Sequence, residues 1–131
     1  MEYQSKSHCK FLIALHIILV VKYRKKLLVG DVGEFVKNSI LNLSESSDFQ
    51  VEEIEVVKDH IHILLTISPT FSISQHLRNI KQHTTCQLWK AFPILKCQFW
   101  NEKTFWSDGY FVCSVGNASA DTIKKYIQEQ G

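Results

Sequence analysis

The chain has 131 residues, of which 45% are hydrophobic and 21% charged, and this composition predicts one globular domain over residues 1–131 and excludes an intrinsically disordered chain. The four cysteines form no Cys-x-x-Cys pair, which argues against a zinc ribbon or a redox motif, so we expect free thiols in a reducing, cytoplasmic setting. The formal net charge of +2 does not by itself indicate a partner.

The first predicted element is a strand over residues 10–23. Its apolar part, residues 11–21, is interrupted only by His16. Eleven residues are too few for a membrane-spanning helix, which needs about 20, so we expect no membrane segment. The high content of Ile, Leu and Val favours a buried strand instead.

A helix is predicted next, with Asp31 as its expected N-cap. Two strands follow, residues 50–57 with one wet face and residues 61–67, and Lys58 and Asp59 can form the turn of a hairpin between them. The apolar residues of the helix recur at helical spacing, at Val32, Phe35, Val36, Ile40 and Leu43.

A second helix is expected to begin at Ser72 or Ser74 and to run to about Ala91, before Pro93. Residues 99–115 are rich in aromatic residues and valine, which indicates a strand or extended structure. Ser119 then caps a last helix that ends near Gln130. The inner stripe of the second helix is expected to consist of Ile73, Leu77, Ile80, Thr84 and Leu88.

The order strand, helix, strand, strand, helix, strand, helix is that of the split β-α-β fold with one extra helix. We therefore predict an α+β, ferredoxin-like or RRM-like domain: an antiparallel sheet with helices on one face, plus a C-terminal helix. RNA-binding modules and small-molecule sensor domains share this layout, so function has to come from particular residues.

Charged residues are unevenly distributed along the chain. Residues 44–59 carry six acids, whereas residues 60–101 contain no carboxylate but include Arg78, Lys81, Lys90 and Lys96. Such segregation can create a positive face on a nearly neutral protein. An ordinary solvated surface is the alternative interpretation.

His60 and His62 begin a strand otherwise dominated by Ile and Leu. Side chains two apart on a strand point to the same face, with Cα atoms about 6.6 Å apart, so the two imidazoles could converge on one metal ion. The alternative is a pair of histidines that binds nothing.

On the last helix, Tyr126 and Gln130 are four residues apart and therefore share one helical face. Ile123 and Ile127 form a neighbouring stripe that can dock, leaving Tyr126 and Gln130 at its edge. The plain alternative is that Tyr126 is a partly buried amphipathic residue.

Taken together, these blocks resemble a known family, the HUH-type single-tyrosine transposases of single-stranded-DNA insertion sequences. The resemblance covers nearly the whole chain. It is carried by His16, Lys22-Tyr23-Arg24-Lys25, Asp59-His60-Ile61-His62, Trp106-Ser107-Asp108-Gly109-Tyr110-Phe111-Val112 and the terminal Tyr126-Ile127 with Gln130.

The resemblance implies that His60, His62 and Gln130 hold a divalent metal and that Tyr126 is the nucleophile. Oxygen ligands suit Mg²⁺ or Mn²⁺, and the imidazoles favour Mn²⁺. The implied enzyme is a DNA transposase that cuts and rejoins single-stranded DNA through a 5′-phosphotyrosine intermediate. Asp59 could orient a histidine, or could be only a turn residue.

Single-stranded or hairpin DNA is the expected partner, along a basic face. The resemblance also implies a homodimer in which Tyr126 completes the partner's site in trans, and a long apolar first strand at a sheet edge would be a physical motive for pairing. The competing functions are a non-catalytic single-stranded nucleic-acid binder, a small-molecule sensor and a hydrolytic metal nuclease. The candidate DNA-binding residues are Lys22, Arg24, Lys25, Arg78 and Lys81.

Overall fold

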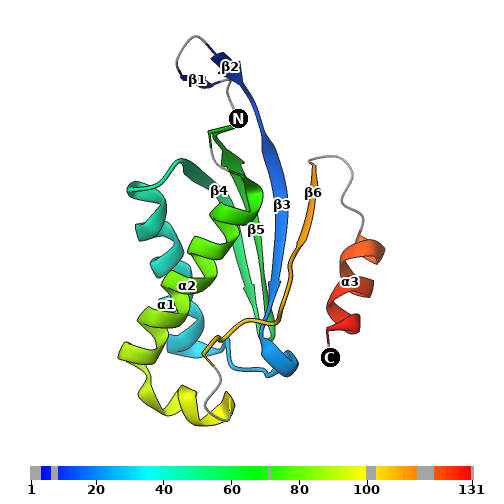
Figure 1. Ribbon diagram of the computed structural model, residues 1–131. Helices are drawn as coiled ribbons and strands as arrows, with labels where there is room; N and C mark the ends of the chain where they lie inside the picture. Colours follow the sequence, from blue (N-terminus) through cyan, green and yellow to red (C-terminus); the bar gives the residue numbers. More distant parts are fainter. Residues whose placement is uncertain (1–3, 7–8, 71, 100–102, 115–119, 131) are drawn as a thin grey trace.

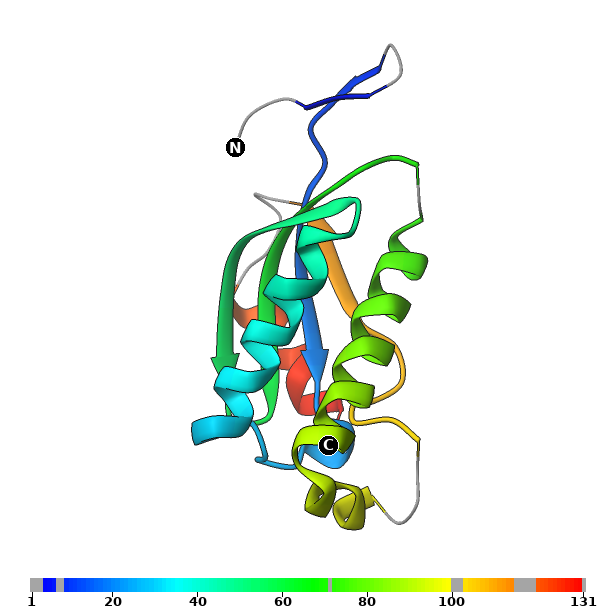
Figure 2. The same ribbon diagram turned by 90° about the vertical axis from the view of Figure 1, so that its left-hand side faces the viewer.

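A computed structural model describes residues 4–6, 9–70, 72–99, 103–114 and 120–130. Its centre is a four-stranded antiparallel sheet in the order β4-β5-β3-β6. The helices α1 and α2 lie side by side over one face, and α3 lies over the other (Figures 1 and 2). The strands are β3 (Ala14–Val20), β4 (Phe49–Val57), β5 (His60–Ile67) and β6 (Phe111–Ser114), and the helices are α1 (Gly30–Glu45), α2 (Ile73–Ala91) and α3 (Ala120–Glu129).

This order confirms the α+β, ferredoxin-like prediction. The main core lies between the sheet and the α1 and α2 helices, where Ile17, Ile63 and Ile80 are at most 1% exposed. Among the described residues, no helix combines the length and the apolar character needed to cross a membrane.

The apolar N-terminal segment departs from its prediction in two ways. It is not one strand: β2 (Cys9–Phe11) pairs with β1 (Gln4–Lys6) in a separate hairpin, β3 begins at Ala14, and a 3-10 turn, η1 (Lys22–Arg24), follows it. The expectation of an edge strand is also wrong, because β3 pairs with both β5 and β6. Its apolar run therefore reflects burial in the middle of a sheet that helices cover on both faces.

The register of β4 explains why its apolar residues do not alternate strictly. Val51 pairs with Leu65, but Glu53 pairs with Leu64, so Glu52 is an extra residue in a β-bulge. The bulge restores the same inward direction to Ile54 after Val51.

The helix starts show one correction and one decision between alternatives. Asp31 is not the N-cap of α1, because the helix begins at Gly30 with Val29 as cap; Asp31 lies in the first turn, where its charge suits the helix dipole. For α2 the cap is Ser72, whose side chain accepts from the backbone N–H of Gln75 while the Gln75 side chain accepts from the backbone N–H of Ser72. The expected cap of α3, Ser119, lies outside the described residues.

The segment before β6 is less regular than predicted. A 3-10 segment, η2 (Pro93–Phe99), replaces the start of the expected strand, and regular strand is confined to β6. Trp106 anchors the segment: it is fully buried, and its indole N–H donates to Thr84 Oγ1 at 2.8 Å. The next residue, Ser107, donates its backbone N–H to Val20 O at 2.8 Å, so it lies at the end of β3.

Candidate metal and nucleophile site

The two histidines of β5 face away from the main core. His60 lies opposite Val20 and His62 opposite Ile18 on β3, while the intervening Ile61 is buried in the core. Both histidines are half-buried. The same-face arrangement predicted from the strand period is therefore present, on the face over which α3 lies.

Asp59 holds the ring of His60. Its Oδ1 lies 2.8 Å from His60 Nδ1, which leaves Nε2 as the ring nitrogen able to ligate. Burial alone would raise the pKa of Asp59, but the hydrogen bond and electrostatic interaction with His60, together with the positive charge of Arg24, outweigh it, so the pKa is lowered. An ionised carboxylate is the form that orients such a ring.

His62 is held by a third histidine, His16 of β3. His16 Nδ1 lies 2.8 Å from His62 Nε2, and the ring centroids are 5.0 Å apart. Burial, and then the charge of His16, lower the pKa of His62, which favours the neutral form that metal ligation requires. With Nε2 engaged, Nδ1 is the nitrogen of His62 left for a ligand.

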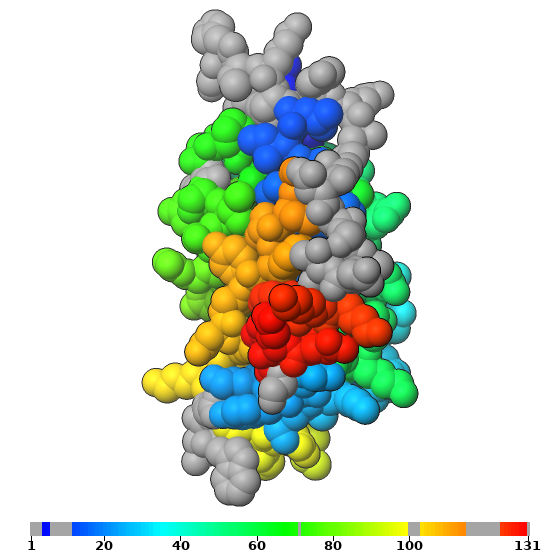
Figure 3. Space-filling view, turned by 90° about the vertical axis from the view of Figure 1, so that its right-hand side faces the viewer, coloured from blue at the N-terminus to red at the C-terminus, as the bar shows by residue number. Residues whose placement is uncertain are grey.

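The helix α3 brings Tyr126 and Gln130 to this side of the sheet. The Tyr126 ring packs on Phe111 of β6, with centroids 5.5 Å apart, and burial raises the pKa of its hydroxyl. The side-chain oxygen of Gln130 accepts a 3.4 Å hydrogen bond from the hydroxyl of Ser107. In Figure 3, α3 lies across this face beside β6 and η1.

A metal on the histidine pair would need a ligand of a further type. In the part of the chain that the structure describes, no cluster of three or more His, Cys, Asp or Glu side chains could hold a metal ion. The amide oxygen of Gln130 comes from the helix that docks on the histidine face. The donor set of His60, His62 and Gln130 therefore fits a cation that accepts nitrogen and oxygen together.

The predicted basic residues fall into two groups. Arg24 Nη1 donates to Gln128 O and its Nε lies 3.6 Å from Asp59 Oδ2, while Lys81 Nζ donates to the backbone oxygens of Ser107, at 2.9 Å, and Gly109. These two cations thus have partners inside the protein. Lys22 and Lys25 lie at η1, where both are partly buried and Lys22 Nζ lies 6.0 Å from the centre of the Tyr23 ring, whereas Arg78 lies exposed on α2.

A groove of 550 Å³ runs between α2 and the segment 103–110. Three of its lining residues are basic, Arg78, Lys81 and Lys103, and none of the described residues that line it is acidic. Tyr110 adds an aromatic ring to the same wall. Charge and ring together suit a nucleic acid.

Several site contacts could not be found from the sequence. His16 interrupts an apolar run, which marks it as unusual, but only the strand register places it against His62. The Ser107–Gln130 bond joins residues from two separate segments. The residues around His16 and Ser107 in the sequence do not indicate that their partners are His62 and Gln130.

The fold matches that of transposase structures. The crystal structure of a candidate transposase from Deinococcus radiodurans superposes with a TM-score of 0.89 at 25% identity, covering 97% of each chain. A REP-associated tyrosine transposase bound to a REP hairpin gives a TM-score of 0.55 at 11% identity, over 94% of this chain and 68% of that one, a likeness of fold alone.

Sequence comparison narrows this class to one family. The model of the family described as "Transposase IS200 like" matches residues 9–130. The ISDra2 transposase TnpA of Deinococcus radiodurans is 30% identical over 115 residues, 88% of this chain and 81% of that relative. The transposase of insertion sequence element IS200 from Salmonella typhimurium is 32% identical over 127 residues, 97% of this chain and 82% of its own length. The chain belongs to the IS200-like transposase family and is a DNA transposase.

Proposed function

We propose that this transposase cuts and rejoins single-stranded DNA through a 5′-phosphotyrosine formed on Tyr126, assisted by Mg²⁺ or Mn²⁺ held by His60, His62 and Gln130. The observation that carries the proposal is the docking of α3 on the histidine face of the sheet. One helix thereby supplies both a nucleophile and a metal ligand to a site whose other ligands lie on β5.

A bound divalent cation would polarise the scissile phosphate and offset charge on the leaving oxygen. Tyr126 loses its proton to solvent as its oxygen bonds to phosphorus, and the 3′ oxygen leaves and takes up a proton. Because burial raises the pKa of Tyr126, the resting hydroxyl is neutral, and deprotonation has to accompany attack. The new ester retains the energy of the broken phosphodiester, so a 3′-OH can rejoin without ATP.

The positions of the site residues are maintained by neighbours that do not react. Asp59 orients His60, His16 orients His62, and the hydroxyl of Ser107 holds Gln130. None of these three supporting residues belongs to α3, and each comes from a separate segment of the chain, so the site depends on the whole face of the sheet. This is preorganisation of the kind that limits reorganisation during reaction.

Single-stranded or hairpin DNA is the proposed substrate. Arg78 and the groove beside it offer positive charge with an aromatic ring, and Lys22 and Lys25 add charge near α3. A fold relative bound to a REP hairpin is in keeping with this substrate. Charge reversal at Arg78 should weaken DNA binding and reduce its salt dependence.

We also propose a homodimer with trans active sites. The single chain docks its own α3, through Arg24, Phe111 and Ser107. Exchange of α3 between two copies would reproduce the same contacts, since each partner surface is present on both copies. Because β3 is not a free edge strand, pairing through β3 does not explain a dimer, and exchange of α3 is the proposed basis of assembly.

The chemistry is tested with labelled single-stranded DNA carrying candidate element ends, with and without Mn²⁺, on denaturing gels. We expect a covalent adduct that needs Tyr126 and the metal, and that His60→Ala or His62→Ala abolishes while DNA affinity persists. His83→Ala, on α2, is the matched histidine control and should cleave normally. An adduct formed by Tyr126→Phe would refute the nucleophile, and activity in excess chelator would refute the metal.

The assembly is tested by mixing inactive Tyr126→Phe protein with inactive His60→Ala protein. With sites formed in trans, a mixed dimer contains one site lacking both defects and recovers partial cleavage. With sites formed in cis, every subunit keeps its own defect and the mixture stays inactive, which would contradict the trans arrangement.

A further inference from the structure

The turn that follows β3 has an unusual backbone. Tyr23 and Arg24 have φ angles of 61° and 52°, in the left-handed region that residues other than glycine rarely adopt. Three bonds hold the turn: Val21 N–H to Asp59 O, Lys22 N–H to Phe105 O and Arg24 N–H to Val21 O, at 2.9, 3.0 and 2.8 Å. The surrounding structure thus imposes this conformation and fixes where the Arg24 side chain emerges.

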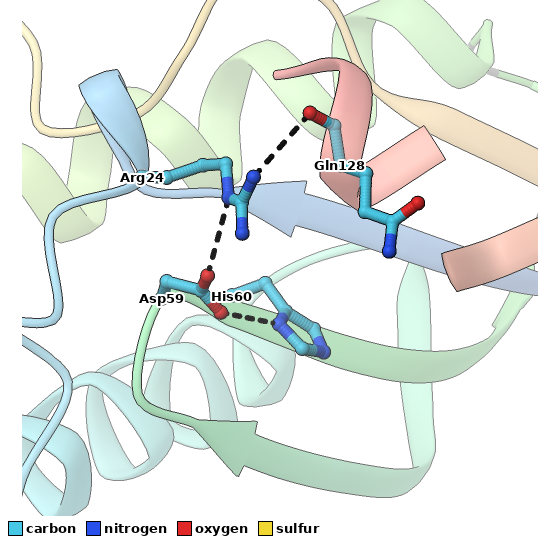
Figure 4. Close-up of polar contacts among 4 residues, drawn as sticks. All are labelled: Arg24, Asp59, His60 and Gln128. Atoms are coloured by element: carbon cyan, nitrogen blue, oxygen red, sulfur yellow. Dashed lines mark hydrogen bonds and ion pairs between the residues drawn. The ribbon is translucent and has the colours of Figure 1, made fainter. Parts of the chain in front are cut away.

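The Arg24 side chain lies between two parts of the site (Figure 4). Its Nη1 donates to the backbone oxygen of Gln128 at 3.4 Å, and its Nε lies 3.6 Å from Asp59 Oδ2. The other carboxylate oxygen of Asp59 contacts His60 Nδ1 at 2.8 Å. One guanidinium group therefore connects α3 to the residue that orients a histidine.

The acceptor on α3 is a carbonyl that the helix leaves without a partner. Gln128 lies in the last turn of α3, where the final carbonyls have no intrahelical donor and carry the negative end of the helix dipole. Gln128 lies two residues from both Tyr126 and Gln130. A cation here stabilises the helix end that presents both residues to the site.

We propose that Arg24 is a positioning residue that couples the docking of α3 to the Asp59–His60 pair, and not a contact to the DNA backbone. The proposal rests on the function proposed above. A guanidinium is suited to this role because its planar fork offers several donors in fixed directions, whereas a lysine ammonium is a single point charge. The inference replaces, for Arg24, the DNA contact predicted from the sequence.

Three variants test the proposal: Arg24→Gln, Arg24→Lys and the control Lys26→Gln, which removes a charge of the same sign from an exposed position in the same segment. Hydrogen exchange of the α3 peptide measures docking directly. In Arg24→Gln we expect α3 to exchange about tenfold faster and Mn²⁺ to bind about tenfold more weakly. Lys26→Gln should change neither quantity.

The salt dependence of single-stranded DNA binding separates coupling from a phosphate contact. With Arg24 in the coupling role, Arg24→Gln leaves the slope of log K against log salt unchanged; a lost phosphate contact would reduce its magnitude by about 0.7. Arg24→Lys keeps the charge but not the fork, so α3 should still exchange several-fold faster than in the wild type. Restoration by lysine of normal exchange would contradict the proposal.

Unchanged α3 exchange in Arg24→Gln, or a slope reduced by about 0.7, would overturn the coupling role. If Arg24→Gln shows no cooperative melting transition, Arg24→Lys decides through the same two measurements. Hydrogen exchange requires neither metal nor cleavage. The effect of Arg24→Gln on α3 exchange can therefore be measured even if the proposed function is wrong. Absence of Mn²⁺ binding by the wild-type protein, or an adduct formed by Tyr126→Phe, would count against the proposed function alone.

Discussion

Replacing Trp106 by phenylalanine tests the bond that attaches the segment before β6 to the core. The indole N–H donates to Thr84 Oγ1 at 2.8 Å, and that hydroxyl in turn donates to Ile80 O at 2.7 Å; Trp106 and Thr84 are both fully buried. Phenylalanine removes the donor and roughly three heavy atoms, worth about 1 kcal/mol for the bond and about 2 kcal/mol for lost burial. We expect Trp106→Phe to destabilise the fold by about 3 kcal/mol.

Urea unfolding measures this loss. With a slope of about 2 kcal/mol per M, the midpoint should fall by about 1.5 M. Thr84→Val removes the same bond from the other side, so the double variant should cost about 1 kcal/mol less than the sum of the two single variants. A coupling energy below about 0.3 kcal/mol would refute the reasoning, because it would mean that the indole and the hydroxyl contribute independently.

Three further predictions concern the same face and its supports. Because the folded-state pKa of Asp59 lies below its ordinary value of 3.8, the stability that its carboxylate contributes is complete above that value and is lost as pH falls through the folded pKa. In Asp59→Asn, the free energy of unfolding should therefore depend less on pH below about pH 4, as measured by acid unfolding followed by circular dichroism. Gly109→Ala should cost about 1 kcal/mol in urea unfolding, since Gly109 has a φ of 78° but an added Cβ meets no atom within 4 Å. Lys81→Met should cost about 1–3 kcal/mol by leaving the carbonyls of Ser107 and Gly109 without a donor, and an unchanged stability would show that water replaces the ammonium group.

The order of the elements was predictable because each has a strong local signal. Alternation of apolar and polar residues marked β4, an apolar run after the Lys58-Asp59 turn marked β5, and period-3.6 spacing marked α2, whose residues Leu77, Ile80, Thr84 and Leu88 are all buried. The placement of β3 was not predictable. An apolar run is compatible with an edge strand that pairs with a partner or with a central strand covered on both faces, and only long-range pairing distinguishes the two.

The position of the site residues was predictable to a similar extent. Spacing alone put His60 and His62 on one strand face, and the structure has them there. The partners that orient these residues depend on contacts between segments far apart in the chain: His16 of β3 contacts His62 on the neighbouring strand β5, and Ser107 contacts Gln130. The basic residues show the same limit, since charge is visible in the sequence but the internal acceptors of Arg24 and Lys81 are not.

The division of the sheet into two faces explains how a chain of this size can hold a polar site. The side chains of Ile61 and Ile63 are buried in the main core and hold the strand against the helices α1 and α2. His60 and His62 occupy the alternate positions and face α3, where a polar neighbour engages one ring nitrogen of each. A one-residue slip of β5 would exchange the two faces and bury both imidazoles in the core, at a high cost in free energy. The packing that stabilises the fold therefore also fixes the direction of the proposed metal ligands, and the site residues can change without loss of the fold.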